Sequence, residues 1–261
     1  MIIYKYRDWA CDNHKKLLLE NELYLAPPSK FNDIFDCKIP ANFSLLNSKK
    51  KISKYINKVA DKNKEQLENE YEDVDKIKIK KIEYFSKNID KLQKKHEELF
   101  IEESNNYLGV IPFSKRWDNI LMWSHYANHH KGFCTGFNHE KFISSGLFKH
   151  LIKVKYSNKF SNLNPLKDGI YKAKKSIDVK SKDWHYEKEY RFFKFTFPDI
   201  LKDDDRKIKI LDNFFTEIII GLNTSENDKE TLIDIGRQKK INVYEIVKVP
   251  FKFKINRKQI I

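Results

Sequence analysis

Residues 47–104 restrict most strongly what this chain can fold into. Lysine, glutamate, aspartate and isoleucine dominate this segment, glycine and proline are absent, and apolar residues recur at helical spacing. Segments rich in aromatic and β-branched residues flank it on both sides. The pattern predicts a helical hairpin, residues 47–104, inserted into one α+β domain that spans residues 1–261. Its mixed charge is typical of a solvated helix face rather than a nucleic-acid patch.

The flanking segments alternate between strand and helix patterns. Strands are expected at residues 1–7, 23–26, 107–114, 132–137, 150–157, 184–195, 215–221 and 242–253. Helices are expected at residues 12–22, 119–130 and 225–239, the last opened by a cap from Ser225 to Asp228. This mixed order favours the α+β class. The chain contains neither G-x-G-x-x-G nor G-x-x-x-x-G-K-[ST], so the usual Rossmann and P-loop routes to nucleotide binding are excluded.

Charge and cysteine content indicate the partners and the compartment. The formal net charge is +14 and the pI is near 9.4, which favours an anionic partner such as nucleic acid or a nucleotide. Three widely spaced cysteines without a C-x-x-C motif suggest no disulfide framework, so a reducing cytoplasm is expected. The start of the chain lacks signal-peptide features, and no run approaches the roughly 20 apolar residues of a membrane span. We therefore expect a cytoplasmic protein without a membrane partner.

The stretch WHYEKEYRFFKF, residues 184–195, combines titratable and aromatic residues. Side chains alternate across a strand, so residues two apart share a face. One face then carries His185, Glu187, Glu189 and Arg191, and the other carries Trp184, Tyr186, Tyr190 and Phe192. Two interpretations remain open: an amphipathic strand whose solvent face alternates in charge, or a pair of carboxylates that belongs to a site.

Five segments together resemble a known family. In order they are YKYRD, LYLAPPSKFNDIFDC, GVIPFS, NILMWSHYANHHKGFCTGF and WHYEKEYRF, and they span nearly the whole chain outside the helical insertion. They resemble the DUF2971 family of uncharacterised bacterial proteins. That family has no established reaction, so the resemblance directs attention to residues rather than to a function.

The order of these segments is also similar to the layout of ADP-ribosyltransferases. There, an early strand holds NAD, a middle Ser or Tyr element supports the nicotinamide, and a late glutamate strand acts on the ribose. The resemblance implies largely antiparallel sheets around a central cleft, NAD as a substrate, and an enzyme that is a toxin or phage-defence effector modifying nucleic acid or protein. It assigns catalysis to Glu189 and Glu187, and NAD binding to Arg7, Tyr6, Ser124, His125, Tyr126 and Arg191, which we expect to converge on one cleft.

The chemistry behind this assignment follows from the residue types. Loss of nicotinamide develops oxocarbenium character on the ribose, which a carboxylate such as Glu189 stabilises through a ribose hydroxyl. A second carboxylate, Glu187, can orient or deprotonate the acceptor. The planar guanidinium of Arg7 suits a diphosphate better than an ammonium does.

Other functions compete with this hypothesis. Asn32, Asp33 and Asp36 could hold Mg²⁺ beside the two glutamates in a nuclease, although Asn and Asp at such positions are also common turn and cap residues. His125 and His129 have the spacing of metal ligands on a helix but lack the glutamate of H-E-x-x-H, and we assign no metal ligand. A non-catalytic nucleic-acid-binding module would account for the net charge without any active site.

Overall fold

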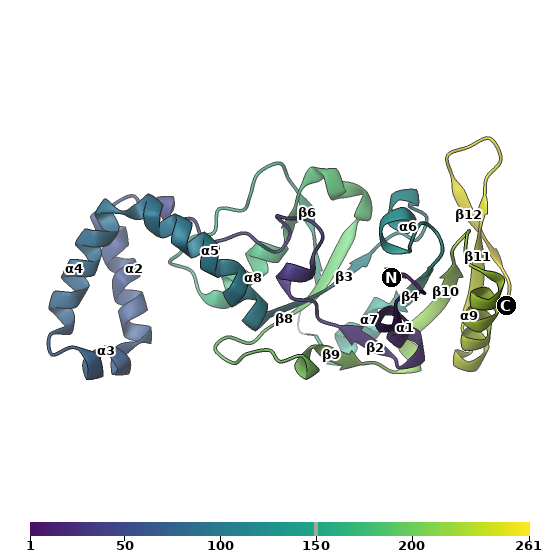
Figure 1. The fold of residues 1–261 in the computed structure, drawn as a ribbon, viewed down its shortest axis with the longest axis horizontal. Coiled ribbons are helices and arrows are strands. Elements are labelled where there is room, and N and C mark those ends of the chain that lie inside the picture. Colours follow the sequence, from purple (N-terminus) through teal and green to yellow (C-terminus); the bar gives the residue numbers. More distant parts are fainter. Residues whose placement is uncertain (149–150) are drawn as a thin grey trace.

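A computed structural model describes residues 1–148 and 151–261 and confirms the α+β class. Its main sheet has eight strands in the order β12-β11-β10-β4-β1-β3-β8-β5 (Figure 1). Every neighbouring pair in it is antiparallel except β10 and β11. The strands are β1 (Ile2–Arg7), β3 (Leu108–Ser114), β4 (Phe133–Asn138), β5 (Leu151–Lys153), β8 (Glu189–Phe195), β10 (Phe215–Ile220), β11 (Asn242–Lys248) and β12 (Ile255–Gln259).

Short elements complete the β structure. Two small sheets pair β2 (Glu22–Tyr24) with β9 (Lys207–Lys209) and β6 (Lys155–Tyr156) with β7 (Val179–Lys180). The turns of 3₁₀ helix are Pro28–Lys30, Phe43–Leu45, Lys182–Glu187, Asp204–Arg206 and Asp212–Phe214.

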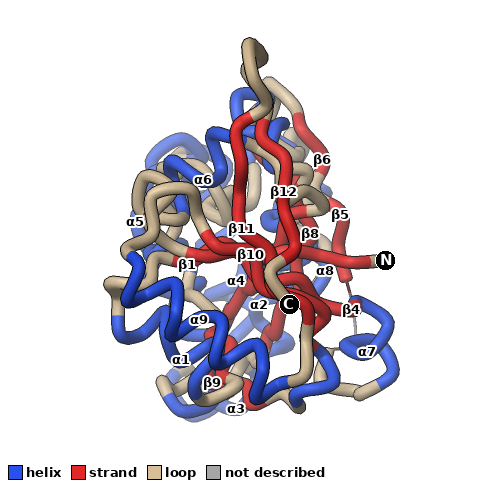
Figure 2. The backbone as a smooth tube through the Cα atoms, turned by 90° about the vertical axis from the view of Figure 1, so that its right-hand side faces the viewer, coloured by secondary structure: helices blue, strands red, loops and turns tan. Residues whose placement is uncertain are grey.

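Helices bury both faces of the main sheet (Figure 2). Leucines and isoleucines of α1 (Asp12–Leu19) and α9 (Glu226–Lys239), with Phe142 of α7 (His139–Ser144), join one core. Met122 and Trp123 of α6 (Ile120–Tyr126) join the other. Strand alternation separates the two cores, since Ile218 and Ile220 of β10 pack into the first and Ile219 into the second. The predicted Ser225 cap of α9 is confirmed, because the Ser225 hydroxyl accepts a bond from the Asp228 N–H.

Four helices form an arm at one end of the molecule (Figure 1). They are α2 (Lys49–Lys62), α3 (Lys64–Glu70), α4 (Val74–Lys87) and α5 (Ile89–Tyr107), and α5 leads back to the sheet. Side chains of α2 and α4 pack with the preceding loop in a small core of their own that includes Phe43, Ile52 and Phe85. A ninth helix among the described residues, α8 (Gly169–Ile177), precedes β7. Within this described part of the chain, no helix is long and apolar enough to cross a membrane.

The sheet opens as a fork between β1 and β3, which pair only at Tyr4 and Ser114. Pro112 explains the opening. The N–H and C=O groups of Val110 both bond with Ala26 on the side of β3 away from β8. Backbone groups two residues apart point to the same side of a strand, so those of Pro112 also point away from β8, into the gap beside β1. Because proline has no N–H, it cannot continue the ladder toward β1. The Lys5 ammonium instead donates a 2.7 Å bond to the Pro112 carbonyl across the gap.

Several sequence-based boundaries were wrong. The strand expected at 184–195 starts only at Glu189, because Lys182–Glu187 is a 3₁₀ turn capped by Ser181 and Lys188 is left-handed at φ 48°. The alternation expected for His185 and Glu187 therefore does not apply. The helix expected at 119–130 ends at Tyr126, and the following Asn128, His129 and His130 all have positive φ.

Two other expected strands are shorter than the patterns suggested. The strand at 242–253 ends at Lys248, and a turn connects it with β12. The segment 150–157 contains the two short strands β5 and β6, and its first residue lies outside the described residues. After Lys248 the chain enters a turn in which the Val249 N–H bonds to the Lys254 carbonyl and Phe251 has a φ of 56°.

Candidate functional site

A pocket lies at the fork between β1 and β3. Strand β1 and the end of β3 line two sides, α6 contributes Met122 and Tyr126, and Lys180, Glu187 and Glu189 line the remainder with the loop around Asn32. Its cavity measures about 80 Å³, below the roughly 300 Å³ at which pockets for complete small ligands begin. Only part of a larger substrate would enter it.

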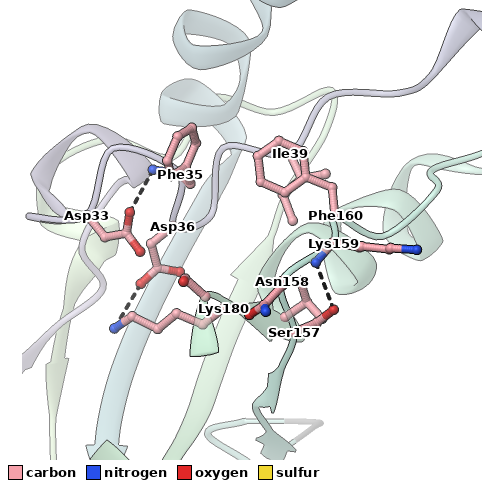
Figure 3. A pocket seen from close by; sticks show the side chains of 11 residues that line it. Asp33, Phe35, Asp36, Ile39, Ser157, Asn158, Lys159, Phe160 and Lys180 are labelled. Atoms are coloured by element: carbon pink, nitrogen blue, oxygen red, sulfur yellow. Dashed lines mark hydrogen bonds and ion pairs between the residues drawn. The ribbon is translucent and has the colours of Figure 1, made fainter. Parts of the chain in front are cut away.

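Lys180 lies at the centre of a buried ionic network beside this pocket. Its Nζ atom is 2.6 Å from Glu187 Oε2, 3.4 Å from Glu189 Oε2 and 3.3 Å from Asp36 Oδ2. Figure 3 shows the contact between Lys180 and Asp36. All four side chains are at most 4% exposed. One buried ammonium therefore contacts three carboxylates, and a second cation is needed to balance most of their charge.

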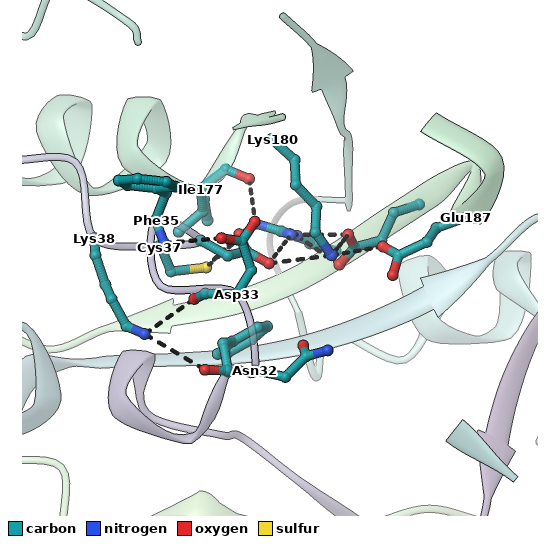
Figure 4. A network of polar contacts seen from close by, with 12 residues as sticks. Asn32, Asp33, Phe35, Cys37, Lys38, Ile177, Lys180 and Glu187 are labelled. Atoms are coloured by element: carbon teal, nitrogen blue, oxygen red, sulfur yellow. Dashed lines mark hydrogen bonds and ion pairs between the residues drawn. The ribbon is translucent and has the colours of Figure 1, made fainter. Parts of the chain in front are cut away.

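Arg191 forms the second cationic centre of the network. Figure 4 shows the part of the network around Lys180 and Glu187. Its guanidinium holds Glu189 through Nε at 2.7 Å and Nη2 at 2.8 Å, and holds Asp36 through Nη1 and Nη2, both at 2.8 Å. A further N–H donates to the carbonyl of Ile177 at 3.0 Å. Burial disfavours the charged form of Asp36, but Arg191 and Lys180 outweigh burial and hold the pKa of Asp36 below its usual value. This fully buried arginine positions Glu189 and Asp36.

Glu187 has a pKa well above the usual value of a glutamate. Burial raises the pKa of Glu187 to about 7, and the Glu189 carboxylate adds to the rise, although Lys180 and the Tyr126 hydroxyl oppose it. Tyr126 donates a 2.6 Å hydrogen bond to Glu187 Oε1. With three carboxylates and two cations, the fully ionised network carries one excess negative charge. A proton on Glu187 removes that excess, so this carboxyl group is suited to exchange protons near neutral pH.

Two cations of β1 occupy the gap of the fork. Lys5 is 4% exposed, and beyond its bond to Pro112 it lies over the Phe113 ring at 5.1 Å. Arg7 Nη1 donates to the Tyr6 carbonyl at 3.3 Å. Neither has a carboxylate within ion-pair distance in the described part of the chain. Burial lowers the pKa of Lys5 well below its usual value and that of Arg7 to about 10.

The structure brings together five of the eight predicted site residues. Those that line the fork pocket are Tyr6, Arg7, Tyr126, Glu187 and Glu189, and Arg191 lies in the adjoining network. Tyr6 is largely a core residue, whose ring packs edge-on against Trp123 and whose hydroxyl donates to the Arg116 carbonyl.

Ser124 and His125 are absent from the lining of this pocket. The Ser124 hydroxyl donates to the Ile120 carbonyl and lies 3.5 Å from His130 Nε2. The exposed ring of His125 packs near Trp184 and Tyr186. Both residues lie on α6, and although the His125 ring lies edge-to-face with Tyr126, neither side chain reaches the pocket.

Sequence reasoning missed Lys180 and Lys5 and considered Asp36 only as a metal ligand or as a turn or cap residue. A single lysine is inconspicuous in a chain with 51 lysines and arginines. The one available signal for the turn before Glu187 was Ser181 followed by Asp183, since the Ser181 side chain caps that turn by accepting from the Asp183 N–H.

The metal interpretations find no ligand set among the described residues. No group of three or more His, Cys, Asp or Glu side chains there is arranged to hold a metal ion. Asp33 Oδ1 accepts a bond from the Phe35 N–H, as a turn-forming aspartate does. His129 follows the end of α6 with a φ of 54°, so it does not share a helix face with His125.

Comparison with known families gives one match. Residues 122–192 match DUF2971, a family described as a protein of unknown function. The predicted resemblance to DUF2971 is thus confirmed over a segment that runs from α6 to β8. The DUF2971 segment carries Tyr126, Lys180, Glu187, Glu189 and Arg191, which is the network apart from Asp36. No curated protein and no solved structure matches the chain.

Proposed function

We propose that the fork pocket is the active site of an NAD-dependent ADP-ribosyltransferase-like enzyme. The observation that carries the proposal is the combination of two cations without carboxylate partners, Lys5 and Arg7, with Glu187, whose pKa is raised by burial to about 7. An anionic group of the substrate complements the cations, and a group that exchanges protons near neutrality lies in the same pocket.

The proposed reaction uses these groups in separate roles. Arg7 and Lys5 bind the diphosphate of NAD at the gap between the strands. The bond between the ribose C1′ and the nicotinamide nitrogen breaks, and the bonding electrons leave with the nicotinamide, which becomes neutral. An acceptor oxygen or nitrogen then bonds to C1′, and its proton passes to ionised Glu187. The cavity of about 80 Å³ admits only the reacting part of the dinucleotide, so the remainder lies along the surface.

The two glutamates keep the roles that the resemblance implies, but Glu189 acts through its charge rather than through a hydrogen bond to a ribose hydroxyl. Both oxygens of Glu189 are bonded to Arg191, so this carboxylate contributes a fixed negative potential that stabilises an oxocarbenium ion. Glu187 has one oxygen on Lys180 and the other on Tyr126, and it remains able to accept a proton. We therefore assign proton transfer to Glu187.

Label transfer from NAD tests the proposal. The protein is incubated with NAD labelled in its adenylate half, with the nucleic-acid and protein fractions of a bacterial lysate as separate acceptors. We expect labelling of one fraction together with release of nicotinamide, and a loss of about 10²-fold or more in Glu187→Gln. Glu102→Gln on exposed α5 is the matched control. Absence of nicotinamide release with every acceptor, or equal turnover in Glu187→Gln, would overturn the proposal.

A further inference from the structure

A second pocket lies on the opposite side of the ionic network. It measures about 270 Å³ and is lined by the loop around Phe35, by residues 157–160 and by residues 179–181 (Figure 3). Lys180 is the one lining residue that it shares with the fork pocket. The proposed transfer reaction does not use this pocket, so a ligand that bound here would have a separate role.

Two phenylalanine rings stand exposed at this pocket. Phe35 is 51% exposed and Phe160 is 57% exposed, although their ring centroids are 5.6 Å apart in an edge-to-face arrangement. They come from segments more than a hundred residues apart in the chain. Two apolar rings that are about half exposed at a pocket offer a surface on which a flat aromatic ligand can stack.

Asp33 supplies a polar group without a partner. The residue is 7% exposed, its Oδ1 accepts the Phe35 N–H at 2.9 Å, and its Oδ2 is buried without a hydrogen-bond partner among the described residues. Lys38 fixes the same loop by donating to the carbonyls of Phe31 and Asp33. A buried acceptor in a rigid loop at the wall of a pocket is suited to a ligand that brings an N–H donor.

The charge around the pocket selects among ligands that carry such a donor. Lys159 and Lys180 both line the pocket, and the Lys159 ammonium makes no ion pair among the described residues. Lys180 is already paired with Asp36, Glu187 and Glu189, so Lys159 is the cation of this pocket that is open to a ligand. A ligand that places an anionic group beside exposed Lys159 and an uncharged N–H donor beside Asp33 matches both groups.

We propose that this second pocket binds a nucleobase that carries an exocyclic amine, stacked on the Phe160 ring beside Phe35, with the amine donating to Asp33 and the adjoining phosphate near Lys159. The base belongs either to a free nucleotide or to a single-stranded nucleic acid, which share this chemistry. The proposal stands on the pocket, the exposed rings and the unpartnered oxygen, and it does not depend on ADP-ribosyl transfer.

Equilibrium binding of matched nucleotides to the full chain tests the hydrogen bond. AMP presents an amine where inosine 5′-monophosphate presents a carbonyl, and the two are otherwise alike in shape. We expect the wild type to bind AMP at least about tenfold more tightly. In Asp33→Asn the amide can keep its bond to the Phe35 N–H and turn its NH₂ toward the ligand, so we expect the preference to reverse. Equal affinities for both nucleotides in the wild type, or an unaltered preference in Asp33→Asn, would overturn the proposal.

Stacking is tested by a second pair of variants. Phe160→Ser should weaken AMP binding by about fivefold or more, whereas Phe197→Ser, which removes a similarly exposed ring outside the pocket, should leave it unchanged. Equal effects of the two substitutions would contradict stacking on Phe160. Tighter binding of a short single-stranded oligoadenylate than of AMP identifies nucleic acid as the source of the base, and equal or weaker binding identifies a free nucleotide. Absence of binding to either would rule out the site.

Discussion

The Tyr126 hydroxyl donates a 2.6 Å hydrogen bond to Glu187 Oε1 and so joins the last residue of α6 to the turn that precedes β8. Lys180 holds the other oxygen of the same carboxyl group at 2.6 Å. These two contacts restrain a carboxyl group whose pKa is raised by burial, and substitution of either partner should change that pKa.

Replacement of Tyr126 by phenylalanine should raise the pKa of Glu187 further. The tyrosine hydroxyl stabilises the ionised carboxylate, so its removal favours the protonated form. We expect a rise of roughly 0.5–1 unit above a value of about 7. The rising limb of the pH dependence of NAD turnover, and an NMR titration of the Glu187 carboxyl carbon, should both move to higher pH. A shift to lower pH would contradict the assigned role of the hydroxyl.

Glu187 should also make stability depend on pH. Its pKa is raised from an ordinary 4.5 to about 7 in the folded protein, so between these values the folded state binds more protons than the unfolded state. The contribution of Glu187 to stability is therefore present below about pH 4.5 and is lost as the pH rises through about 7. The loss amounts to at most about 3 kcal/mol.

Urea denaturation of the wild type and of Glu187→Gln at pH 5 and pH 8 measures this effect. Glutamine does not titrate, so the difference in unfolding free energy between the two proteins should shift in favour of Glu187→Gln at the higher pH, by up to about 3 kcal/mol. Parallel pH dependences in the two proteins would show that the pKa of Glu187 is not raised by folding.

The network could be predicted from the sequence only in part. The strand pattern correctly placed Glu189 and Arg191 on β8, where alternation directs both to one side and Arg191 can hold Glu189. Glu187 is not part of this strand. It ends the 3₁₀ turn before the left-handed Lys188, and its carboxyl group contacts the network at Lys180. Local periodicity carries no information on such a turn.

The rest of the site depends on contacts between distant segments. Asp36 meets Arg191 across 155 residues of sequence, and Lys5 meets Pro112 across 107. Each residue taken alone has a common local interpretation, a turn aspartate or a strand lysine, and no spacing rule connects the members of such a pair. The α+β class was predictable because it needs only the order of the elements, whereas the ionic network needs the tertiary fold.

Arg191→Lys should destabilise the protein severely. Lysine cannot reproduce the paired bonds to Glu189 and Asp36, so buried carboxylates would lose their partners. We expect a loss of about 3–5 kcal/mol in the free energy of unfolding, measured in urea. The control is Arg237→Lys, which alters an exposed pair with Asp234 and should cost less than about 1 kcal/mol. Similar costs for the two variants would show that the buried clamp adds nothing to stability.

Lys5→Met should stabilise the protein while weakening its binding of anions. Lys5 is buried without a carboxylate partner, and burial lowers its pKa well below the usual value. We expect the desolvation that an apolar side chain of similar length removes to outweigh the lost bond to the Pro112 carbonyl. We expect a gain of roughly 1–4 kcal/mol in thermal or urea unfolding at pH 7. Binding of inorganic pyrophosphate should fall by about tenfold. The control, Lys94→Met at an exposed position, should change neither the stability nor the binding of pyrophosphate. A Lys5→Met protein that is less stable than the wild type would show that the charge is needed for folding.

Pro112→Ala should narrow the fork. The antiparallel register set by Tyr4 and Ser114 brings Tyr6 opposite position 112, and an alanine there supplies the N–H that the ladder lacks. The Tyr6 carbonyl, which accepts a bond from Arg7 in the wild type, would accept that N–H and release the guanidinium from the gap.

The stability of Pro112→Ala should change by less than about 1 kcal/mol, because the new bond and the greater entropy of the unfolded chain offset each other. We expect slow hydrogen exchange at the new amide and at least tenfold weaker NAD turnover, by analogy with other misplacements in active sites. Fast exchange at residue 112, with turnover equal to the wild type, would show that proline does not hold the strands apart.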